Sequence, residues 1–148
     1  MKAKYFVITA LLIAGIGIGS CTKSTSNPTI ANVTFIATLN GASETPANAS
    51  TASGTATFTY DPTTYILSGT VNFTGLVATA AHIHMGAVGV AGSVIFPLGS
   101  ASPTSPISFT SSALTTQQQS DLMNGLYYVN VHSATFPGGE IRGQLVKQ

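Results

Sequence analysis

Charge and cysteine are the scarcest features of this sequence. Charged side chains make up 6% of the 148 residues, against about a quarter in an average soluble domain. With so few charges there is no basic patch for nucleic acid and no acidic run, so we expect no nucleic-acid partner. Cys21 is the single cysteine, which excludes an intramolecular disulfide and a cysteine-based zinc site.

The first residues have the layout of an export signal. Two lysines precede an apolar run, residues 5–18. This run is interrupted before it reaches the length that a transmembrane helix normally needs. Small residues stand directly before Cys21. This order resembles the lipobox of bacterial lipoproteins, which implies cleavage before the cysteine and attachment of lipid to it. The alternatives are a cleaved signal peptide with an unmodified cysteine, and an uncleaved anchor.

We therefore expect three segments along the chain. Residues 1–20 form a lipoprotein signal peptide, residues 21–31 form a flexible tether rich in Ser, Thr, Asn and Pro, and residues 32–148 form one domain. The expected location is the bacterial cell envelope, where lipid on Cys21 holds the protein to a membrane. We expect the outer membrane, with the domain facing the periplasm or the exterior.

Residues 32–148 have the pattern of antiparallel strands. Apolar and polar residues alternate in short segments bounded by turn residues, as in half-buried strands. The expected strands are residues 33–39, 54–60, 65–73, 93–98, 126–133 and 140–147, together with the segment around 81–86. One short helix is expected near 115–124, because Thr115 or Thr116 can cap it and Gly125 can end it.

The strand pattern predicts an all-β fold. We expect a single antiparallel Greek-key β-sandwich or barrel of about seven or eight strands with one short helix. Its expected architecture is immunoglobulin-like or similar to that of copper-zinc superoxide dismutase.

The three histidines fall in two of the expected strands. His82 and His84 stand one residue apart, so in an extended chain both project from the same side. His132 shares a strand face with Tyr128 and Asn130. If the two strands are neighbours, three imidazoles meet, and imidazole suits copper or zinc, with a fourth position open or filled by water. The alternative is three partly buried structural histidines, bonded to backbone carbonyls, to Asn130 or to each other.

A second polar group lies near the end of the chain. Glu140 shares a strand face with Arg142, the only arginine. Because a buried arginine can satisfy several acceptors through its planar fork, we expect a structural polar clamp. Its expected members are Glu140, Arg142, Asn130 and Glu44, which would tie the last strand to the histidine strands or to the loop at 40–46. The alternative makes Glu140 a base or an additional metal ligand.

Several blocks of the sequence resemble one known family. They are Ala81-His82-Ile83-His84, Tyr127-Tyr128-Val129-Asn130-Val131-His132-Ser133, Pro137-Gly138-Gly139-Glu140-Ile141-Arg142-Gly143, and the earlier Leu39-Asn40-Gly41-Ala42-Ser43-Glu44. Together they look like the CHRD domain, named for the chordin extracellular proteins, and the resemblance covers nearly all of residues 32–145. In animals this domain belongs to secreted antagonists of bone morphogenetic proteins. The resemblance therefore implies a fold and an extracellular compartment, but no reaction.

The pair of histidines is also similar to part of an enzyme. A His-x-His pair closely followed by glycine occurs in the strand that provides copper ligands in copper-zinc superoxide dismutase. The zinc-loop ligands and disulfide cysteines of that enzyme have no counterpart in this sequence. This absence argues against dismutase activity even if copper binds.

The sequence leads to one expectation and one alternative for function. We expect a membrane-anchored, extracytoplasmic CHRD-domain lipoprotein that serves as a non-enzymatic binding or envelope-structural module, with an extracellular protein or glycan as partner. The alternative is a copper- or zinc-binding protein that uses His82, His84 and His132, with redox catalysis ranked behind simple binding. The sequence contains no nucleophile elbow, no phosphate-binding loop and no His-Glu-x-x-His helix, so we expect no catalytic residue.

Overall fold

The computed structural model describes residues 30–148. The expected signal peptide, the expected lipidation site Cys21 and the tether up to residue 29 lie outside the described residues. Within residues 30–148, no helix has both the length and the apolar composition needed to cross a membrane.

The described chain folds into one antiparallel sheet. Its strands are β1 (Val33–Asn40), β2 (Ser53–Asp61), β3 (Ile66–Thr74), β4 (Ala78–Met85), β5 (Ser93–Pro97), β6 (Ile107–Thr110), β7 (Tyr127–Ser133), β8 (Ile141–Gln144) and β9 (Val146–Lys147). The order across the sheet is β5-β4-β7-β8-β1-β2-β3-β6, and β9 pairs with β1. A 3-10 turn, η1 (Gly41–Ser43), follows β1, and one helix, α1 (Thr116–Met123), precedes β7.

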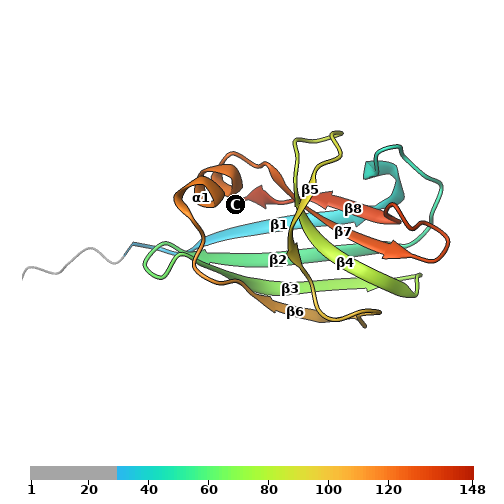
Figure 1. Ribbon diagram of the computed structural model, residues 1–148, viewed down its shortest axis with the longest axis horizontal. Coiled ribbons are helices and arrows are strands. Elements are labelled where there is room, and N and C mark those ends of the chain that lie inside the picture. Colours follow the sequence, from blue (N-terminus) through green and yellow to red (C-terminus); the bar gives the residue numbers. More distant parts are fainter. Residues whose placement is uncertain (1–29) are drawn as a thin grey trace, which may run out of the picture.

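The sheet curls until its two edges approach each other. Phe96 on edge strand β5 and Phe109 on edge strand β6 have ring centroids 5.6 Å apart. Figure 1 shows β1, β2, β3 and β6 side by side, with β4 and β5 crossing them at a steep angle. The curl encloses the hydrophobic core, in which Phe35, Phe58 and Val129 are fully buried.

Local sequence explains the first hairpin and the helix. The Asp61 carboxylate accepts a hydrogen bond from the backbone N–H of Thr63, 2.7 Å away, and this bond closes the turn between β2 and β3. Thr115 caps α1 reciprocally, because its hydroxyl accepts from the Gln118 N–H and its own N–H donates to the Gln118 side chain. Gly125, with a φ of 69°, follows the end of the helix.

The expected all-β class with one short helix is confirmed, but two strand assignments differ. β6 is missing from the expected strands, because a four-residue segment is too short to show a clear alternation. The expected last strand, 140–147, is divided into β8 and β9. The division occurs at Leu145, whose side chain is fully buried and whose N–H donates to the Tyr127 carbonyl at 2.9 Å.

Candidate metal site on strands β4 and β7

One face of the sheet carries the histidines because of the register of three strands. In the pairing of β4 with β7, His82 lies opposite Asn130 and His84 lies opposite Tyr128. In the pairing of β7 with β8, Asn130 lies opposite Arg142. Residues opposite each other in a sheet project from the same face, so these side chains form a polar face. The intervening residues face the core and are fully buried: Ile83, Val129, Val131 and Ile141.

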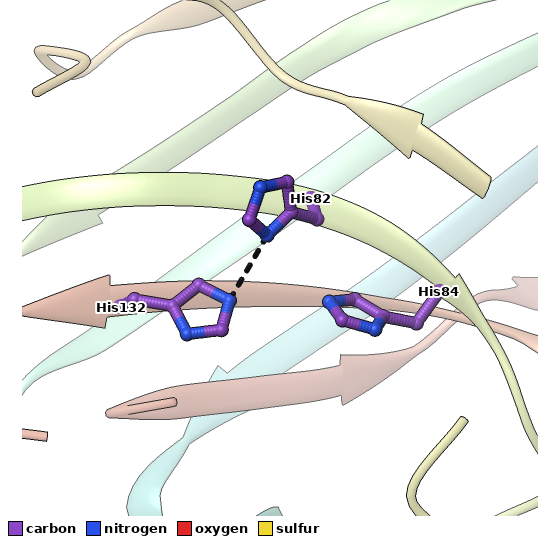
Figure 2. A group of neighbouring side chains, drawn as sticks. All are labelled: His82, His84 and His132. Atoms are coloured by element: carbon purple, nitrogen blue, oxygen red, sulfur yellow. Dashed lines mark hydrogen bonds between the residues drawn. The ribbon is translucent and has the colours of Figure 1, made fainter. Parts of the chain in front are cut away.

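His82, His84 and His132 meet on this polar face. His82 Nδ1 lies 3.1 Å from His132 Nε2, and one ring nitrogen from each histidine lies within 4.8 Å of the others. Figure 2 shows the three rings turned toward a common point, with His82 and His84 projecting from one strand and His132 from its neighbour. The structure therefore brings together all three residues that the sequence singled out as metal ligands.

Backbone carbonyls fix the protonation of two of the rings. His84 Nδ1 lies 3.0 Å from the carbonyl oxygen of Gly92, and His132 Nδ1 lies 3.0 Å from that of Pro137. A carbonyl only accepts hydrogen bonds, so in both neutral rings the proton sits on Nδ1 and the lone pair on Nε2. Metal-binding histidines in proteins usually donate their second ring N–H in this way.

The electrostatics of the site favour the neutral imidazole. Burial lowers the pKa of all three histidines below the ordinary value. The neighbouring histidines lower the pKa of His82 further, and the charge of Arg142 does the same for His84. Hydrogen bonds from His84 to Gly92 and from His132 to Pro137 act in the opposite direction but are outweighed. At neutral pH all three rings are therefore in the form that binds metal.

The residues present fit a transition-metal ion. Two imidazole nitrogens bound tetrahedrally to one ion at about 2.0–2.1 Å lie roughly 3.3 Å from each other, close to the 3.1 Å between His82 and His132. The Nε2 of His84 is buried and has no hydrogen-bond partner among the described residues. The group consists of imidazoles alone. Imidazole favours copper, zinc, iron or nickel over magnesium, calcium or manganese, for which carboxylate and carbonyl oxygens are preferred.

A stack of three side chains supports His84. Its ring lies parallel to that of Tyr128, with centroids 5.0 Å apart and 11° between the planes. The guanidinium carbon of Arg142 lies 3.5 Å from the centroid of the same tyrosine. Arg142 also donates to the Ala87 carbonyl at 2.9 Å and to the Thr45 hydroxyl at 3.3 Å. These contacts connect β8 to the loop after β4 and to the loop after β1.

The four residues of the expected polar clamp do not all contact each other. Asn130 donates to the Glu44 carboxylate at 3.4 Å, and the charge of Arg142 lowers the pKa of Glu44 against the larger, raising effect of burial. Glu140 instead accepts a hydrogen bond from Ser50 at 2.6 Å. Within residues 30–148, no hydrogen bond joins Glu140 to Arg142. Glu140 therefore holds the long loop after η1, while Asn130 and Arg142 lie on the histidine face and Glu44 contacts Asn130.

Backbone groups of the site have no signal in the sequence. Gly92 and Pro137 contribute carbonyl oxygens, an atom that every residue type has, although only a glycine fits at position 92, where a Cβ would collide with the Met85 carbonyl. Tyr128 does have a signal, since alternation places it on the face of His132. Gly139 also has one: its φ is 135°, and a Cβ there would lie 2.5 Å from the Asn130 amide and 2.7 Å from the Glu44 carboxylate. A glycine is therefore required beside this network.

Comparison with known proteins gives a family and nothing closer. The family model described as the CHRD domain matches residues 35–145. No curated protein matches the chain. No solved structure matches it either.

Proposed function

Because the chain belongs to the CHRD domain family, we propose that it is an exported binding module whose ligand is a copper or zinc ion held by His82, His84 and His132. The observation that carries the proposal is the convergence of three neutral imidazoles, two of which already present an unprotonated Nε2. An ion that displaced the hydrogen bond between His82 and His132 would gain three ligands without any change of fold.

The proposed role is binding rather than catalysis. Once all three imidazoles hold the ion, the described residues leave no further imidazole, carboxylate or thiolate in the group to act as an acid or base. A bound ion would supply Lewis acidity and an open fourth position. Redox catalysis is the weaker alternative, because a reactant at the open position would find no further proton donor or acceptor of the group beside it.

Calorimetric titration of the full chain in detergent tests metal binding. We expect one saturable site for Cu(II) or Zn(II), tighter than about micromolar, and its loss in His84→Ala. Asn72→Ala, on the exposed surface of β3, is the matched control and should bind as the wild type does. No saturable site, or a site that His84→Ala leaves unchanged, would refute the proposal.

If metal does not bind, the family membership favours a second candidate. This is a metal-independent binding or envelope-structural module, whose partner is an extracellular protein or a glycan. In that case the histidines serve as structural residues, bonded to each other and to the carbonyls of Gly92 and Pro137.

The proposed location is the bacterial envelope, with lipid on Cys21 as the attachment to the outer membrane. The support is the order of an apolar run, small residues and cysteine in the sequence. Cys21→Ser is expected to abolish acyl labelling and to release the protein from the membrane fraction. A variant that keeps both the label and the membrane association would contradict the lipid anchor.

A further inference from the structure

The three histidines differ in how firmly their rings are held for metal binding. We infer from this that the site is an exchange site, which passes its ion on to an acceptor. His84 and His132 form a fixed pair of ligands, while His82 is a displaceable third ligand through which the ion passes to an acceptor. The inference rests on the proposed function and adds to it the class of partner: an acceptor with imidazole or thiolate ligands.

The anchors of the fixed pair are themselves held in place. The Gly92 carbonyl orients His84, and the Gly92 N–H donates to the Tyr128 hydroxyl at 3.0 Å, while the Tyr128 ring stacks on His84. The Pro137 carbonyl orients His132 from a turn closed by a 3.0 Å hydrogen bond between the Gly139 N–H and the Phe136 carbonyl. Both rings are buried, with exposed fractions of 8% for His84 and 9% for His132.

His82 has no comparable anchor. Within residues 30–148 its ring makes one hydrogen bond, to His132 Nε2 at 3.1 Å. Since His132 carries its proton on Nδ1, the shared proton belongs to His82 Nδ1. To bind a metal through Nδ1, His82 must move this proton to Nε2. His84 already presents a lone pair without a partner, and His132 presents one that is released when its hydrogen bond from His82 breaks. Binding also removes the hydrogen bond to His132, and His82 is the most exposed of the three residues.

This difference determines where exchange takes place. A ligand without an outer-shell anchor dissociates more readily than one whose ring is fixed. During transfer, the bond from the ion to His82 breaks first as a bond to the acceptor nitrogen or sulfur forms. The bonds to His84 and His132 then break as further acceptor ligands replace them, and the oxidation state does not change. A thiol acceptor gives its proton to solvent. His82 then recovers its hydrogen bond to His132 once the ion has left.

Metal release to a chromophoric chelator tests the inference. With the Zn(II)- or Cu(II)-loaded full chain, we expect the release rate to rise in proportion to chelator concentration, because the chelator displaces His82 directly. His82→Ala should keep one-to-one binding with a raised dissociation constant, because the two anchored ligands remain. His84→Ala and His132→Ala should lose saturable binding. His82→Asn, which retains a polar side chain, provides a second variant, and circular dichroism establishes that each variant is folded.

The outcomes separate this inference from the proposed function. If the wild type binds neither ion, the proposed function fails and the exchange site fails with it. If the wild type binds one ion, but release is independent of chelator concentration or the three alanine variants are equally weakened, the exchange site alone is refuted. Proportional release together with unequal variants supports both.

Discussion

Replacement of Arg142 by alanine should destabilise the domain by about 3 kcal/mol. Arg142 is 2% exposed, lies over the Tyr128 ring at 3.5 Å and donates to the Ala87 carbonyl at 2.9 Å. A desolvated cation–π contact contributes about 2 kcal/mol, and a hydrogen bond from a charged donor about 1.5–3 kcal/mol. Relief of the cost of burying the guanidinium offsets part of this loss, whereas the Glu44 carboxylate loses a favourable charge.

Urea unfolding of the metal-free protein measures the effect. A loss of about 3 kcal/mol corresponds to a midpoint lowered by roughly 1.5 M, for a slope near 2 kcal/mol per molar urea. Arg142→Lys should recover only part of the stability, because an ammonium keeps the charge but lacks the planar fork. Lys147→Ala removes an exposed cation and should change the stability by less than about 0.5 kcal/mol.

A second readout distinguishes the proposed contacts from a general packing loss. Because the charge of Arg142 lowers the pKa of Glu44, Arg142→Ala should raise that pKa. An unfolding free energy within about 1 kcal/mol of the wild type, together with an unchanged pKa of Glu44, would refute the reasoning.

Two further predictions concern the core and pH. Tyr127→Phe should leave stability unchanged or raise it by about 1 kcal/mol, because the buried Tyr127 hydroxyl has no partner among the described residues. Tyr60→Phe loses a 2.9 Å hydrogen bond to Gln119 and should lower stability. Equal losses of stability in urea unfolding would contradict this prediction. For the histidines, the folded-state pKa values lie below the usual value of 6.5, so the unfolded chain takes up protons first as pH falls. Their contribution to stability is complete above about pH 7.5 and decreases below about pH 6.5. Because the pKa of Glu44 is raised, its contribution to stability falls as pH rises above the usual carboxyl pKa near 4.5. A stability of the metal-free protein that does not change between about pH 7.5 and 6 would contradict the neutral state assigned to the histidine rings.

Alternation in the sequence was sufficient to predict most strands and the faces of their side chains. Alternation places His82 and His84 on one face of their strand and Ile83 on the other, and it places His132 on the same face as Asn130. It does not give the register between strands, because pairing of β4 with β7 depends on the curl of the whole sheet and on the loops that connect it. That register is what places His82 opposite Asn130 and closes the group of three histidines.

The contacts that orient the site were beyond sequence reasoning for a different reason. The Gly92 and Pro137 carbonyls are backbone groups, and their positions follow from loop conformation rather than residue type. Glu140 accepts its hydrogen bond from Ser50, ninety residues away in sequence. The strand face that Glu140 was expected to share with Arg142 therefore did not identify this hydrogen-bond partner. Short segments such as β6 carry too few residues for periodicity to identify them.

Metal content tests the central claim most directly. The full chain, purified without added metal, is analysed for copper and zinc beside a variant in which His82, His84 and His132 are all alanine. We predict a stoichiometric amount of one of these metals in the wild type and none in the variant. A wild type without metal, or a variant with the same metal content, would contradict a three-histidine site.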